Sequence, residues 1–267
     1  INKQPQGCFM SKEGVFMKSQ SYGILDIAKF FSALLVIAIH CAPFIEVNEA
    51  FNLFYVQVVA RLAVPFFFTA SGWLFFRKID PKRGMRGEEN VTALKHYWKR
   101  IFKLYFVWSI LYLPLLALHW IQGGFDTFTL IRLLRDVLLN GTYYHLWFFP
   151  ALLLGVPIVY CLYTSWNKRS MLWVCGGLYV IGMLINVYGN VLGSIPFLGS
   201  VIHAYESIFV TSRNGLFFAP LYLVLGIYAQ DFIDQPYKRQ AGFAFLFAFV
   251  AFCIEAWLLV EWGIMHD

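Results

Sequence analysis

Apolar runs of about 20 residues follow one another along this chain of 267 residues, and each is long enough for an α-helix to cross the hydrocarbon core of a bilayer. Hydrophobic residues make up 60% of the chain and charged residues only 13%, a balance that ordinary soluble domains do not show. The runs therefore predict an all-α fold, a polytopic bundle of transmembrane helices. We expect seven spans, at about residues 24–45, 51–77, 101–120, 145–164, 171–188, 213–230 and 241–261.

Charged connections predict the orientation of these spans. The connection after the second span carries nine lysines and arginines from Arg77 to Lys103, whereas the connection before it, "IEVNEAFN", carries only acidic charges. Because basic loops stay on the cytoplasmic side of a membrane, we expect the amino terminus inside and the carboxyl terminus outside. Residues 1–22 would then be a cytoplasmic tail and residues 23–267 one transmembrane domain. The odd number of spans, and an ending directly after the last one, suggest a bundle that further helices complete.

The composition gives little support to other classes of function. The formal net charge is +6 at pH 7, but the basic residues lie in short loops between spans, where membrane topology accounts for them. We therefore expect no nucleic-acid partner. The five cysteines show no CxxC spacing, so nothing indicates a zinc site or a disulfide framework, and we expect no bound metal.

The first span carries Lys29 and His40 on one face, since they are eleven residues apart, which corresponds to about three turns and roughly 16 Å of helix. An ionisable side chain inside a span usually faces the bundle and marks a functional site. With this span running outward, Lys29 lies near the cytoplasmic end and His40 in the outer half, as two ends of a polar path. Two alternatives stay open. Lys29 could pair with Asp26 one turn earlier, and His40 could be a buried neutral histidine with both nitrogens satisfied.

The second span carries Arg61 close to the middle of the membrane, within "ARLAVPFFFTASGWLFF". Arginine does not give up its charge, so this side chain needs an anionic partner. Pro65 lacks the N–H that would bond the carbonyl of residue 61, which predicts a kink and a free acceptor beside the guanidinium. Arg61 could instead be an interhelical hydrogen-bond anchor without a role in chemistry.

The outer ends of two later spans add further polar side chains. "GTYYHLWFFPALLLG" supplies His145 and Trp147, and "YESIFVTSRNGLFFAPLYLVLG" supplies Glu206, Arg213 and Asn214. Two polar residues leading directly into a long apolar run suit a half-buried binding site, although Arg213 and Asn214 could equally cap a helix. For Trp147 and the neighbouring tyrosines, an aromatic belt at the membrane interface is the competing explanation.

In chain order, these segments resemble the membrane acyltransferase 3 family of bacterial integral-membrane O-acyltransferases. The resemblance rests on a basic residue, ten intervening residues and a histidine in the first span, followed by "RLAVPFFFTASGWLFF", "HLWFFPALLLG" and "SRNGLFFAPLYLVLG". It runs from about residue 24 to residue 265, and "RNGLFFAP" is most similar to the branch that forms the membrane half of glycopeptide-resistance serine racemases. Lys29 stands where the family more often has arginine, which keeps the charge but weakens bidentate phosphate recognition.

The resemblance implies a bundle of about ten helices in the bacterial cytoplasmic membrane. Such a bundle takes an acyl group, most simply acetyl, from cytoplasmic acyl-CoA and delivers it to a hydroxyl of a cell-envelope glycan or similar acceptor. The donor and the acceptor are then the expected partners, together with the lipid bilayer. A homodimer is left open.

The residue chemistry and the resemblance together predict which side chains act. We expect the phosphates of acyl-CoA to bind basic side chains at the cytoplasmic end: Lys29, Arg77, Lys78 and Arg100. Histidine is suited to remove a hydroxyl proton at neutral pH, so His40 is the candidate base, and Arg61 would stabilise the oxyanion. A covalent acyl-histidine is left open, and no GxSxG nucleophile motif is present. The acceptor would be positioned by residues at the outer ends of the spans: His145, Trp147, Glu206, Arg213 and Asn214.

Transport is the main alternative to catalysis. Lys29, His40, Arg61 and Glu255 could line a path for a small zwitterion such as serine, which would suit the racemase-associated branch. Transporters of this kind usually contain inverted repeats with broken helices, and the sequence shows no obvious internal repeat. A purely structural membrane anchor would explain neither the arginine nor the histidine inside the spans.

Overall fold

The computed structural model describes residues 23–123, 127–193, 195–233, 250 and 254, and every regular element in these ranges is helical. The all-α expectation is therefore confirmed for this part of the chain. The predicted tail, nearly all of the last predicted span and Glu255 lie outside the described residues. The α-helices are α1 (Gly23–Cys41), α2 (Glu49–Phe54), α3 (Ala63–Phe76), α4 (Glu88–Gly123), α5 (Thr127–Arg135), α6 (Phe148–Ser165), α7 (Lys168–Gly193), α8 (Pro196–Ile208) and α9 (Ala219–Ile233).

Five helical stretches in the described ranges are long and apolar enough to cross a membrane: Gly23–Cys41, Glu49–Phe76, Glu88–Leu118, Tyr144–Ser165 and Lys168–Asn186. They coincide with the first five predicted spans, as a multi-pass membrane protein requires. For the sixth span, the structure describes α9 over Ala219–Ile233, which begins six residues later than predicted, and residues 234–249 lie outside the described ranges. The expected count of seven spans is thus not reached in the described residues.

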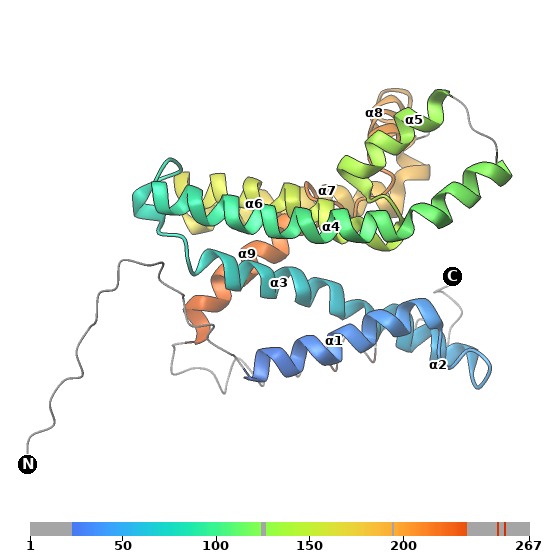
Figure 1. Cartoon of the computed structure of the whole chain (residues 1–267), viewed down its shortest axis with the longest axis horizontal. Helices are drawn as coiled ribbons and strands as arrows, with labels where there is room; N and C mark the ends of the chain where they lie inside the picture. Colours follow the sequence, from blue (N-terminus) through green and yellow to red (C-terminus); the bar gives the residue numbers. More distant parts are fainter. Residues whose placement is uncertain (1–22, 124–126, 194, 234–249, 251–253, 255–267) are drawn as a thin grey trace, which may run out of the picture.

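The helices form two groups with α9 between them (Figure 1). Helices α4, α6 and α7 run along one side, and α1 and α3 run along the other. Helix α9 packs against α3, α6 and α7, so it connects the two groups. Helix α9 is therefore a central packing element.

Two segments that we expected to be connections contain helices, α5 and α8, which lie together at one end of the molecule (Figure 1). A hydrogen bond joins the two helices: the guanidinium of Arg135 on α5 donates to the backbone oxygen of Ser207 on α8, at 3.1 Å. The same arginine is paired with Asp136, at 2.9 Å. These contacts hold α5 and α8 together at this end of the bundle.

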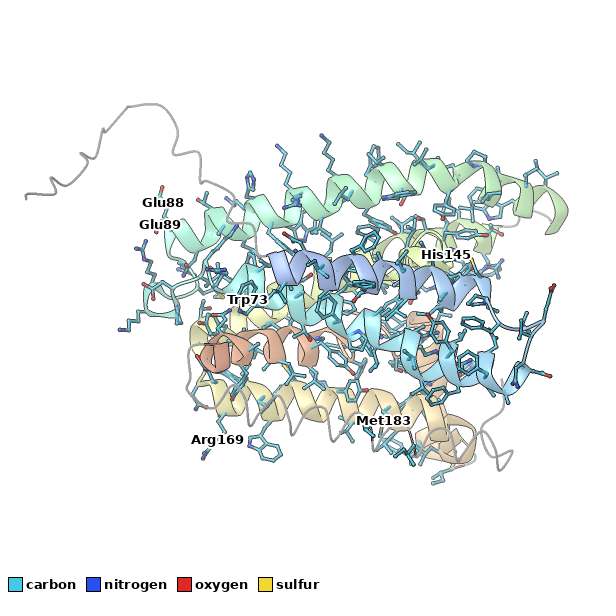
Figure 2. The ribbon with its side chains drawn as sticks, turned by 90° about the horizontal axis from the view of Figure 1, so that it is seen from below. Trp73, Glu88, Glu89, His145, Arg169 and Met183 are labelled. Carbon is cyan, nitrogen blue, oxygen red and sulfur yellow. The ribbon has the colours of Figure 1, made fainter. Side chains whose placement is uncertain are left out.

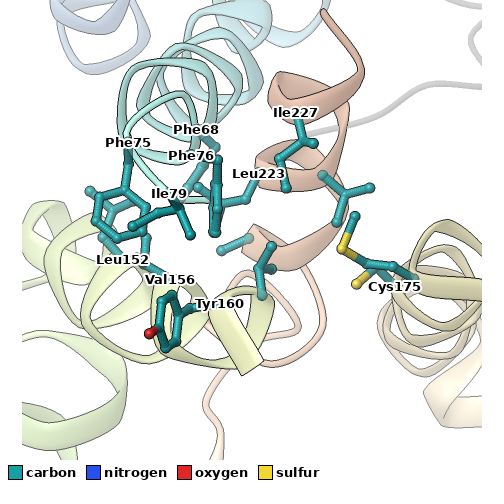
Figure 3. Packing of buried hydrophobic residues seen from close by; sticks show 14 of the residues in the cluster. Phe68, Phe75, Phe76, Ile79, Leu152, Val156, Tyr160, Cys175, Leu223 and Ile227 are labelled. Atoms are coloured by element: carbon teal, nitrogen blue, oxygen red, sulfur yellow. The ribbon is translucent and has the colours of Figure 1, made fainter. Parts of the chain in front are cut away.

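The core forms where α3 and α9 approach each other most closely. Gly72 and Gly226 make this approach possible, since a methyl group at Gly226 would lie 2.6 Å from the backbone nitrogen of Trp73, and one at Gly72 would overlap the backbone of Leu223. Small residues at crossing points are the usual basis of tight packing between membrane helices. Large apolar side chains fill the space around this crossing (Figure 3): Phe68, Phe75, Phe76, Ile79, Leu152, Val156, Leu223 and Ile227.

The basic connection between α3 and α4 is folded into an ordered turn by Asn90. The Asn90 amide nitrogen donates to the backbone oxygens of Asp80 and Gly84, at 2.8 and 3.1 Å, and its oxygen accepts from the Asp80 N–H at 3.1 Å. Within this turn, Glu89 raises the pKa of Arg83 by a hydrogen bond and by its charge. Arg83 therefore already has a carboxylate partner, and its charge is less available to an external phosphate.

Candidate active site

The helix that carries Arg61 is irregular where the arginine occurs. A π-helical turn at Tyr55–Val59 and a 3₁₀ turn at Ala60–Leu62 precede α3. We expected a disturbance at Pro65, and the irregular turns lie shortly before it, within a helical stretch that runs from Glu49 to Phe76. The irregular turn therefore lies on the amino-terminal side of the proline. Such π turns occur frequently at functional sites, and this one carries cavity-lining residues.

A cavity of about 620 Å³ is lined by side chains from α1, the irregular turn, α3, the 3₁₀ turn before α6, α6, α7, the segment before α9 and α9 itself. Five of the residues selected from the sequence line it: His40, Arg61, His145, Trp147 and Arg213. The structure thus brings together groups from four separate predicted spans. Most of the remaining wall is aromatic or aliphatic, whereas His40, Arg61 and Arg213 are themselves exposed.

His40 and His145 lie against each other on this wall. The centroids of their imidazole rings are 4.1 Å apart, at an interplanar angle of 74°, and the Tyr144 ring lies 3.6 Å from that of His145. The Nδ1 atom of His145 is buried and has no hydrogen-bond partner among the described residues. Figure 2 shows His145 toward one end of the bundle and Trp73 toward the other. The histidine pair thus occupies the end of the cavity at which α1 finishes.

A second cavity, of about 700 Å³, shares three lining residues with the first: His40, Trp147 and Arg213. Another π-helical turn, Asp136–Asn140, contributes both of its end residues to this wall. These shared residues lie between the two cavities. A ligand that entered either cavity would therefore reach the imidazole of His40.

Arg213 is held in place by its neighbours. Its guanidinium carbon lies 6.0 Å from the centroid of the Trp147 ring, within the range of a cation–π contact. The next residue, Asn214, is buried and lines neither cavity. Its amide oxygen accepts hydrogen bonds from the N–H groups of Leu216 and Phe217, both at 2.9 Å. Asn214 therefore caps the turn before α9, which is the alternative that the sequence had left open.

The other selected residues lie elsewhere. Glu206 on α8 is exposed and lines neither cavity. Lys29 also lies outside both cavities, and its ammonium pairs with Asp26 at 3.2 Å, as one of the two sequence-based interpretations expected. Three further basic residues at the same end of the bundle are exposed and line neither cavity: Arg77, Lys78 and Arg100.

Several polar residues of the cavities were not selected from the sequence. Gln57 lines the first cavity and was detectable, because it is an amide inside an otherwise apolar run. Tyr179 and Tyr222 line the same wall, and their hydroxyls are 3.3 Å apart. Asp136 and Asn140 face the second cavity from a segment that we expected to be a connection. A tyrosine in a predicted span resembles a residue of the interfacial aromatic belt, so only the fold identifies Tyr179 and Tyr222 as cavity residues.

Comparison with known proteins gives a consistent result. A family model described as an acyltransferase domain matches residues 22–266. An amino-acid racemase from Enterococcus faecalis is 30% identical over 224 residues, which are 84% of this chain and 30% of the relative. A serine/alanine racemase from Enterococcus gallinarum is 30% identical over 247 residues, 91% of this chain and 34% of the relative.

The chain spans about a third of the length of the curated relatives it matches. No solved structure matches it. The family model, in contrast, covers nearly every residue, including all the helices that form the cavities. On that basis, the chain belongs to the acyltransferase 3 family.

Proposed function

We propose that this protein transfers an acyl group, most simply acetyl, from cytoplasmic acyl-CoA to a hydroxyl of a cell-envelope glycan or similar acceptor. The observation that carries the proposal is the cavity that His40 and Arg61 line together. An imidazole can serve as a base at neutral pH, and a guanidinium stays positive in a poorly solvated site. Acyl transfer to a hydroxyl needs both functions.

The reaction follows from these two groups. His40 accepts the hydroxyl proton while the hydroxyl oxygen attacks the thioester carbonyl, forming the new C–O bond. The carbonyl oxygen becomes an oxyanion, and Arg61 stabilises its charge. Collapse of this intermediate breaks the C–S bond, and the departing thiolate takes the proton back from the His40 imidazolium. The products are the acylated acceptor and free CoA thiol.

Donor and acceptor would reach the cavity from opposite ends. We assign the end with the basic connection to the cytoplasm, because short basic loops are retained there. Its exposed cations would bind the CoA phosphates: Lys29, Arg77, Lys78 and Arg100. The acceptor would enter through the second cavity past Trp147 and Arg213 and would meet His145 in the first cavity, while Asn214 would hold the turn that carries Arg213. A bacterial cytoplasmic membrane is the expected location.

Purified protein tests the proposal directly. Protein in lipid nanodiscs, supplied with acyl-CoA labelled in the acyl group and with envelope glycan, should form a labelled glycan and release CoA thiol in equal amounts. His40→Ala should lose this activity, and an unchanged rate in that variant would exclude His40 as the base. Fractionating the labelled product would identify the acceptor.

The racemase names of two curated relatives favour a second candidate. This chain would then be the membrane domain of a racemase-type resistance protein and would move a small amino acid such as serine across the bilayer. Two cavities that share His40 and Arg213 are compatible with a path from one side to the other. Proteoliposomes loaded without acyl-CoA separate the candidates, since transport predicts uptake of labelled serine and acyl transfer predicts none.

A further inference from the structure

Two guanidinium groups line the first cavity, and none of the described residues in its wall carries a carboxylate. The guanidinium groups belong to Arg61 and Arg213. The ion pairs in the described ranges involve other cations: Lys29, Arg83, Arg135 and Lys168. The cavity therefore carries an excess of positive charge.

The two arginines are accessible to a ligand in the cavity. Both side chains are exposed, and most of the other lining residues are apolar. Neither can lose its proton at physiological pH. Cations inside a membrane bundle are normally offset by an anion, because unpaired charge in a low-dielectric site is expensive. An anionic occupant of the cavity would supply that offset.

We propose that the acceptor carries a carboxylate close to its reacting hydroxyl, and that Arg213 binds this carboxylate. The inference rests on the proposed acyl transfer and adds the chemical class of the acceptor. Arg213 borders both cavities, so an acceptor that arrives through the second cavity meets it on the way to His40. The planar guanidinium of Arg213, beside the Trp147 ring, can present two parallel donors to a carboxylate.

Charge balance favours a monoanion. One carboxylate offsets Arg213 and leaves Arg61 free for the oxyanion, which appears only as the reaction proceeds. A phosphate dianion would engage both arginines before the reaction, and interactions already made in the ground state do not accelerate the chemical step. The wall around the arginines is also mainly apolar, which suits a small organic acid better than a strongly hydrated ion.

Ligand binding without any donor tests this inference. The unfolding temperature of the purified protein would be measured by scanning fluorimetry with sodium lactate, glycerol or sodium phosphate, all at matched ionic strength. We expect lactate to raise the unfolding temperature and glycerol to leave it unchanged. Arg213→Gln should weaken the apparent lactate affinity at least tenfold. Arg169→Gln, at the exposed start of α7, is the matched control and should bind lactate as the unsubstituted protein does.

The possible results distinguish the carboxylate assignment from the proposed acyl transfer. Equal stabilisation by glycerol, stronger stabilisation by phosphate than by lactate, or undiminished lactate binding in Arg213→Gln would overturn the carboxylate assignment. If Arg213→Gln does not fold, Arg213→Lys keeps the charge without the planar pair of donors and should weaken lactate binding severalfold. Acyl transfer to a neutral glycan without lactate binding would leave the proposed function intact and remove this inference. Lactate binding without acyl transfer would instead remove the proposed function and leave Arg213 as a carboxylate-binding residue.

Discussion

The imidazole of His40, at the end of α1, packs edge to face against that of His145, in the 3₁₀ turn before α6, with ring centroids 4.1 Å apart. Both rings line the first cavity, and only His40 also lines the second. Contact with a second ring restricts the rotation of the first. His145 thus orients the imidazole that separates the two cavities.

Removing the His40 imidazole should abolish most of the activity. A positioned general base contributes about 10²- to 10⁴-fold to a rate, so we expect His40→Ala to lower kcat by that amount. The measurement is release of CoA thiol by purified protein. His96→Ala, on an exposed face of α4, is the control and should retain full turnover. Equal rates in the two variants would contradict the assignment.

His145 should act through His40. His145→Phe keeps an aromatic ring beside His40 but removes both nitrogens, whereas His145→Ala removes the packing as well. If the ring contact matters, His145→Ala should lose more activity than His145→Phe, measured as kcat at saturating donor. The reverse order would instead assign a role to the His145 nitrogens.

Arg61 should be sensitive even to a conservative change. Lysine keeps the charge but lacks the planar donor pair, so Arg61→Lys is expected to lower kcat by about 10²- to 10³-fold, as loss of an oxyanion donor does. The KM for acyl-CoA should change little, because the oxyanion forms only during the reaction. A raised KM with unchanged kcat would make Arg61 a binding residue.

Exposed cations at the opposite end should affect only donor binding. Arg100→Gln and Lys78→Gln are each expected to raise the KM for acyl-CoA several fold, and the effect should shrink at high salt, because exposed charges are screened. The kcat should stay constant. Arg169→Gln changes a basic residue of another connection and should leave the KM unaltered; an equal rise there would indicate a general charge effect.

The α3–α9 crossing should tolerate no added methyl group. Gly72→Ala places a Cβ against the Leu223 backbone, which cannot yield as a flexible side chain can, so we expect a loss of stability of about 1–3 kcal/mol or more. Gly176→Ala is a good control, because a Cβ there meets no other atom within 4 Å. It should be neutral or stabilising by up to about 1 kcal/mol. Thermal unfolding in detergent compares the two variants.

Loss of the Asn214 cap should damage both stability and activity. Asn214→Ala leaves two backbone N–H groups and the turn before α9 without their hydrogen bonds, at an expected cost of about 1–3 kcal/mol. Since this turn carries Arg213, turnover should fall too. Asn167→Ala removes a similar cap from exposed α7, where the amide oxygen accepts from the Ser170 N–H at 2.8 Å. It should cost about 1 kcal/mol and leave turnover unchanged.

Hydropathy located the first five spans, because a bilayer imposes a minimum length of apolar sequence on every helix that crosses it. It placed the start of the sixth span six residues before α9 begins at Ala219. A helix surrounded by other helices can have the same composition as one that faces lipid, so hydropathy does not show that α9 packs against α3, α6 and α7. The same limit applies to α5 and α8, which carry enough polar residues to look like loops.

The sequence by itself determined the class of protein, the family and the choice of His40, Arg61, His145, Trp147 and Arg213, because charge inside an apolar run is costly and therefore conspicuous. Only the tertiary structure decided that these side chains share one cavity, that Asn214 is a cap and that Glu206 and Lys29 lie elsewhere. The periodicity of the sequence predicts which face of a helix a residue occupies, but it does not predict which other helix packs against that face. That choice depends on where small residues such as Gly72 and Gly226 let two backbones touch.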